Sequence, residues 1–144
     1  MTKTEISRLA RTLSRDGAID AADATRLAEA AEKNGLTPTE KIAIAGVLDR
    51  FEDVTTGRAR QTLRQLVCPV VYLGTSARVA QRKLSTELVW AGARSLGIGR
   101  KEGKPTLEVR VRTQAPVPLL RAMLVAGAPN VLANIVCVGT ITPR

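Results

Sequence analysis

Few residues of this chain could do chemistry, and their types exclude several kinds of it. The 144 residues include no histidine, which excludes Ser-His-Asp triads, Cys-His pairs and histidine-ligated metals. Cys68 and Cys137 lie in separate apolar runs; we expect reduced structural thiols, or a disulfide if the two strands are neighbours. Lys83 and Glu87 have the spacing of an ordinary i, i+4 helix pair. The sequence therefore predicts no catalytic residues, no metal ligands, no cofactor and a protein that is not an enzyme.

The charge of the chain is concentrated in its second half. The net charge is +9, of which residues 1–66 carry +1 and residues 67–144 carry +8. This asymmetry indicates a nucleic acid or an acidic protein as a possible partner. Phe51, Tyr72 and Trp90 are the only aromatic residues, which offers little surface for base stacking. The candidate residues for binding an anion or a partner are Arg78, Arg82, Arg100, Lys101, Lys104, Arg110 and Arg112.

These basic residues must be positioned by the second half, and a helical domain precedes them. Apolar residues at helical spacing predict about four short helices within a domain of residues 1–66. Thr37, Pro38 and Glu40 form a capping-box pattern for the third helix, and Thr55 or Thr56 caps the fourth.

A turn at Asp16-Gly17 joins the first two predicted helices, and Gly17 can adopt a positive φ there. Asp20 stands at the N-cap of the second helix with Asp23 three residues on, which predicts a metal-free structural turn. Residues 12–23 also resemble a degenerate EF-hand loop. The resemblance implies oxygen ligands from Thr12, Ser14, Asp16 and Asp20, a closing Asp23, and an Ile19 that bridges to a paired loop. It covers one helix-loop-helix unit and leaves open whether the loop binds calcium.

Residues 67–144 predict a basic α/β domain with the order β-α-β-α-β, so the chain as a whole is expected to be α+β or α/β. The predicted strands are residues 68–73, 106–113 and 135–141, and the predicted helices are residues 77–96 and 119–126. Crossovers of this length favour parallel strands. Residues 97–105 are rich in glycine and basic residues and predict a surface loop, which could become ordered on an anionic partner.

The helix predicted over residues 77–96 is apolar on more than one side. Ala77, Ala80, Leu84, Leu88 and Ala91 form its main stripe, whereas Val79 and Trp90 lie elsewhere on the helix. The second apolar side packs either within the fold or against another copy, so Val79 and Trp90 are candidate interface residues. A three-stranded sheet also leaves open edges that commonly need a cover.

These features lead to two functional hypotheses. The first is a non-enzymatic structural or assembly subunit that self-associates or packs in a larger, virion- or secretion-type complex. The second is a nucleic-acid-binding protein that uses the basic second half. The sequence shows neither a signal-peptide pattern nor a transmembrane run, so we expect a protein of the cytoplasm or of an assembled particle, with no membrane partner.

Overall fold

The structure is a computed structural model that describes residues 3–13, 15, 17–33, 35–51 and 55–138. The chain divides into two compact units, Met1–Pro69 and Val70–Arg144, and each unit is described by itself. The predicted fold class is confirmed, because a helical unit precedes a unit that carries a three-stranded sheet. None of the helices in the described ranges is both long and apolar enough to cross a membrane.

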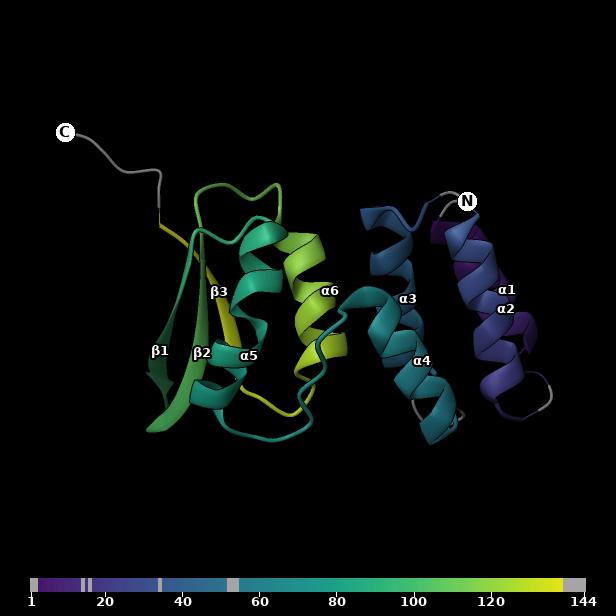
Figure 1. Ribbon diagram of the computed structural model, residues 1–144, viewed down its shortest axis with the longest axis horizontal. Helices are drawn as coiled ribbons and strands as arrows, with labels where there is room; N and C mark the ends of the chain where they lie inside the picture. The colour runs from purple at the N-terminus through teal and green to yellow at the C-terminus, as the bar shows by residue number, and fades with distance from the viewer. Residues whose placement is uncertain (1–2, 14, 16, 34, 52–54, 139–144) are drawn as a thin grey trace. The chain divides into compact units, whose positions relative to one another are not determined.

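Four helices form the first unit (Figure 1). They are α1 (Lys3–Leu13), α2 (Ala21–Glu32), α3 (Pro38–Arg50) and α4 (Gly57–Val67). Helix α1 packs mainly on α3, α2 on α4, and α3 on α4. Their apolar stripes meet in a core in which Ile6, Leu27, Ile44 and Leu63 are fully buried. The short helices that the apolar spacing predicts within residues 1–66 are therefore present.

The helix starts of this unit are fixed by side chains. Asp20 accepts a hydrogen bond from the Asp23 backbone N–H at 3.0 Å, and Asp23 accepts one from the Asp20 N–H at 3.1 Å. Thr37 and Glu40 form the same reciprocal box at the start of α3, and Thr56 caps α4. The hydrogen bond from the Thr37 side chain lowers the pKa of Glu40, against the opposing effect of burial. The predicted capping box of Thr37 with Glu40, the predicted N-cap at Asp20 and the predicted cap at Thr55 or Thr56 are thus confirmed.

The second unit contains two helices and three strands in the order α-β-β-α-β. They are α5 (Ala77–Trp90), β1 (Ser95–Lys101), β2 (Lys104–Val111), α6 (Val117–Gly127) and β3 (Ala133–Cys137). The strands lie in the order β1-β2-β3, with β1 antiparallel and β3 parallel to β2. Figure 1 shows α5 and α6 together on one face of the sheet. Leu107, Val109 and Val111 of β2 are fully buried on that face.

Two predictions about this unit are wrong in detail. The apolar run at residues 68–73 is not a strand; Tyr72 instead donates a single backbone hydrogen bond to the Gly127 carbonyl at 2.7 Å. The stretch of residues 97–105 that is predicted as a loop holds most of β1, the turn, and the first two residues of β2. Glu102 and Gly103 have φ values of 53° and 79°, as a two-residue type I′ hairpin requires. The first connection is therefore an antiparallel hairpin and not a parallel crossover.

Helix α5 is also shorter than predicted, because it ends at Trp90 and Gly92 follows with a φ of 121°. Four of the five predicted stripe residues, Ala77, Ala80, Leu84 and Leu88, are buried. The fifth, Ala91, is only half-buried, because it is the C-cap at the end of the helix. Strand β3 begins two residues earlier than predicted, and residues 139–141 of the prediction lie outside the described residues.

Candidate interaction surfaces

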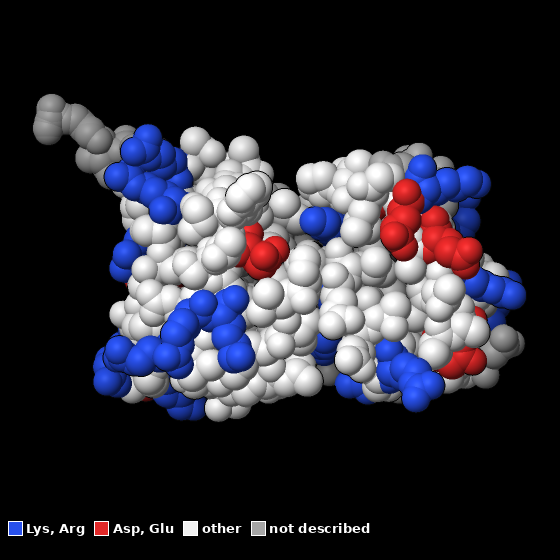
Figure 2. Space-filling view, in the orientation of Figure 1, with Lys and Arg blue, Asp and Glu red and all other residues white. Residues whose placement is uncertain are grey.

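The seven predicted basic residues are distributed over three places on the second unit. Arg78 and Arg82 lie on α5, while Arg100, Lys101 and Lys104 lie at the end of the β1–β2 hairpin. Arg110 is on β2 and Arg112 directly follows it. Figure 2 shows Lys and Arg side chains gathered over the part of this unit that carries α5 and the hairpin. The described residues 70–138 include ten Lys or Arg and three Glu, so this unit is strongly basic.

A groove runs along the exposed side of α5. It has a volume of about 550 Å³ and is lined by Ser76, Arg78, Val79, Gln81, Arg82 and Ser85. The lining combines two guanidinium groups with hydroxyl and amide donors and includes no acidic residue. Guanidinium groups bind phosphate and carboxylate oxygens through paired N–H donors. The groove can therefore accept an anionic group.

The hairpin end is the second basic site. Lys101 and Lys104 lie opposite each other across the turn, and Arg100 Nη1 donates a hydrogen bond to the Gly103 carbonyl at 2.8 Å. These three residues are exposed. Like charges placed directly across a hairpin repel each other, and a bound anion would relieve that repulsion.

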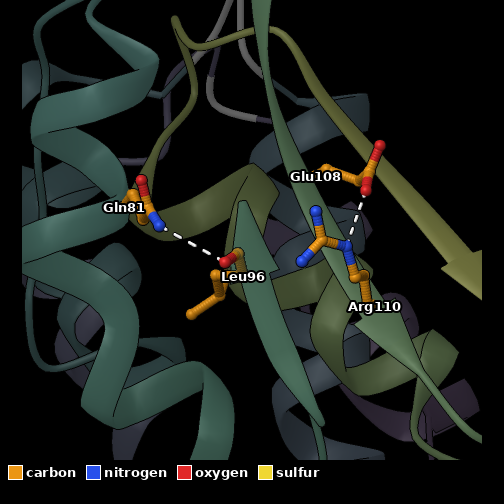
Figure 3. A network of polar contacts seen from close by, with 4 residues as sticks. All are labelled: Gln81, Leu96, Glu108 and Arg110. Carbon is orange, nitrogen blue, oxygen red and sulfur yellow. Dashed lines mark hydrogen bonds and ion pairs between the residues drawn. The ribbon is translucent and has the colours of Figure 1, made fainter. Parts of the chain in front are cut away.

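Arg110 differs from the other predicted basic residues because a carboxylate lies beside it. Arg110 Nε contacts Glu108 Oε1 at 2.7 Å on the sheet face opposite α5 (Figure 3). The Arg110 side chain extends over Gly97, where a Cβ would meet its guanidinium group, and Glu108 extends over Gly99. These glycines let two long side chains of β2 lie across β1. Arg110 is thus partly neutralised, whereas Arg112 is exposed.

The two predicted interface residues have different surroundings. Trp90 is 87% exposed at the end of α5, and its neighbour Val89 is also exposed. Val79 is half-buried and lines the α5 groove beside the arginines. The sequence pattern places both residues away from the main stripe of α5, and the structure agrees.

A second apolar surface, which the sequence patterns above do not assign, surrounds α6 and β3. Val125, Leu132 and Val138 are exposed there, and residues 113–138 contain a single charged residue, Arg121. Leu73 is also exposed, and its carbonyl accepts a hydrogen bond from the Asn130 side chain at 2.8 Å. The near absence of charge over these 26 residues is the feature of the sequence from which this apolar surface could have been predicted.

The acidic turn that resembles an EF-hand loop is described only in part. Ser14 and Asp16 lie outside the described residues. The Thr12 hydroxyl donates to the Arg8 carbonyl at 3.1 Å within α1, and Asp20 and Asp23 cap α2. The parallel bridge between Ile19 and Thr55 joins the α1–α2 and α3–α4 turns. The described residues contain no group of three or more acidic or cysteine side chains that could hold a metal ion.

Cys68 and Cys137 are not joined in a disulfide. Cys68 is buried at the end of α4. Cys137 is partly exposed at the end of β3, where its Sγ donates a hydrogen bond to the Arg112 carbonyl at 3.3 Å. Cys137 is therefore the more accessible thiol of the two.

Comparison with known proteins gives no relative: no family model, curated protein or solved structure matches this chain.

Proposed function

We propose that this chain is a non-enzymatic subunit of a protein assembly, which self-associates or packs in a larger particle through its second unit. The exposure of large apolar side chains carries the proposal. Among the described residues, those side chains all belong to the second unit: Leu73, Val89, Trp90, Val125, Leu132 and Val138. Burying such side chains against a partner would stabilise a complex by about 25 cal/mol for each Å² of apolar surface removed from water, and contiguous exposed apolar surface is typical of interaction sites.

Trp90 provides a direct test because it is the only tryptophan of the chain. Light scattering behind a sizing column should give a native mass that is a multiple of the 15.4 kDa chain mass. Over the same concentration range, Trp90 emission should shift to shorter wavelength if Trp90 lies in the contact. Trp90→Ser should then weaken association, and Thr86→Ala, at an exposed polar position of the same helix, should not. A mass of one chain at all concentrations would refute self-association.

The α5 groove favours a second candidate function, the binding of nucleic acid. Arg78 and Arg82 line one groove with three polar side chains, and the described part of the unit has few acidic residues to oppose a phosphate backbone. Binding of a single-stranded oligonucleotide should weaken steeply with salt and should be reduced in Arg78→Gln/Arg82→Gln. Arg26→Gln/Arg58→Gln, at exposed positions of α2 and α4 in the first unit, is the charge-matched control. Salt-independent binding would contradict this function.

A further inference from the structure

The two outer strands of the sheet differ in how their edges are covered. Gln81 Nε2 donates a hydrogen bond to the Leu96 carbonyl of β1 at 3.3 Å (Figure 3), so that carbonyl faces away from β2. Gln81 also lines the α5 groove with Arg78 and Arg82, which places like charges beside this edge. Proteins protect sheet edges with such side-chain covers and charges. At Leu96 the edge of β1 is therefore covered, and positively charged side chains lie beside it.

The edge of β3 has backbone groups that face away from the sheet. Leu107 N–H donates to the Leu132 carbonyl, and Val138 N–H donates to the Val111 carbonyl, both at 2.8 Å. Because successive residues of a strand direct their backbone groups to opposite sides, the even-numbered residues of β3 face β2. Ala133, Ile135 and Cys137 thus direct their N–H and C=O groups to the outer edge, where the described residues supply no further strand.

The surroundings of this edge carry little charge and several apolar side chains. A pocket of about 270 Å³ lies between α6 and β3, and its lining includes Leu124, Val125, Val131 and Ile135. Leu132, just before β3, is 50% exposed, and Val138, just after it, is also exposed. Arg121 is the single charged residue of the lining. No charge, proline or side-chain cover of the kind found at β1 occurs within β3.

We propose that β3 pairs antiparallel with β3 of a second copy about a two-fold axis at Ile135, which joins two sheets into one of six strands. Ala133 then lies opposite Cys137 of the partner copy, and Ile135 lies opposite its own equivalent. All three outward-facing residues form backbone hydrogen bonds, and no charged residue lies opposite another. This contact is self-complementary and closes as a dimer, whereas β3 on the β1 edge would propagate without closure. The inference rests on self-association as the proposed function and assigns its surface and partner.

Disulfide cross-linking tests the pairing and its register. Within one strand, residues 133 and 137 are about 13 Å apart, too far for a disulfide. Across the proposed contact they are directly opposite, at a Cα separation of about 5.5 Å. Ala133→Cys should therefore form a covalent dimer with the native Cys137 under mild oxidation. The wild-type chain and Ala133→Cys/Cys137→Ser should remain uncross-linked. Equal cross-linking of the double variant would indicate another register and overturn the proposal.

A charge at the same edge provides the second measurement. Ala133 is exposed, so Ala133→Lys should leave the circular dichroism spectrum unchanged and raise the dimer dissociation constant by about tenfold or more. Ser95→Lys, on the other outer strand, is the matched control and should leave the dimer unchanged. An oligomer that persists in Ala133→Lys, with no cross-link in Ala133→Cys, would overturn the β3 contact but leave the proposed function in place. A wild-type chain that is monomeric throughout would overturn both.

Discussion

Gly92 joins α5 to β1 in a conformation that other residues rarely adopt, and its replacement by alanine should destabilise the second unit. Its φ is 121°, and a Cβ at this position would lie 2.5 Å from Cβ of Pro116, just before α6. A non-glycine residue in such a backbone region costs on the order of 1–3 kcal/mol. The steric overlap adds a comparable amount, because the proline ring is rigid and overpacking costs about 1–3 kcal/mol. The expected loss in Gly92→Ala is about 3 kcal/mol.

Gly103→Ala is the control that separates these two contributions. Gly103 also has a positive φ, 79°, but a Cβ at this position would have no atom within 4 Å of it. Its replacement should cost about 1–2 kcal/mol from backbone strain alone. Urea unfolding followed by circular dichroism would compare the two variants. Equal destabilisation of Gly92→Ala and Gly103→Ala would refute the role assigned to the contact with Pro116.

Three further predictions concern the caps and the cores. Thr37→Ala should destabilise the first unit by about 1 kcal/mol through loss of the α3 cap, whereas the exposed Thr39→Ala should change the unfolding free energy by under about 0.5 kcal/mol. The lowered pKa of Glu40 means that its stabilising effect is present above the unfolded-state pKa and is lost as the pH falls through the folded-state value; unfolding free energies measured against pH should show this loss, and Glu40→Gln should reduce it. Leu120→Ala should cost about 2–5 kcal/mol, because Leu120 is fully buried in α6; a thermal midpoint equal to that of the wild type would contradict this.

Local signals in the sequence predict the helices well, because capping depends on residues three positions apart. The boxes of Asp20 with Asp23 and of Thr37 with Glu40 are of this kind. Ser76 has the same relation to α5, since its side chain accepts a hydrogen bond from the Val79 N–H at 3.2 Å. Such contacts form within one turn and need no knowledge of the rest of the fold.

Strand β1 could not be recognised in this way. Gly97 and Gly99 occupy the outer-face positions, so the alternation of polar and apolar side chains that marks a half-buried strand is missing. The side chains of Glu108 and Arg110 on β2 cover these two glycines. Such contacts join residues that are distant in sequence. The strand prediction at residues 68–73 is wrong for the opposite reason. The apolar residues there are typical of a strand, but the segment does not join the sheet.

The sequence predicts which residue types the candidate surfaces contain, but not how their side chains are arranged. The charge asymmetry identified the basic unit, but the sequence did not reveal that Arg78 and Arg82 share a groove or that Arg110 is bound to Glu108. Whether the backbone groups at the edge of a strand are covered depends on which side chains hydrogen-bond to them. Gln81 is 15 residues from Leu96, and no local pattern predicts that contact.

The two connections of the sheet also imply an order of events during folding. The β1–β2 hairpin closes through the two residues Glu102 and Gly103, and hairpins of this kind form in about 1–10 μs. Strand β3 pairs with β2 across a much longer segment, which contains α6, since Leu107 lies opposite Ala133. The entropy cost of closing this longer loop is incurred before the β2–β3 contact contributes any stability. We therefore expect the hairpin to form early and β3 to dock late. In a chain emerging from the ribosome, β2 would present an unpaired edge until β3 has emerged as well.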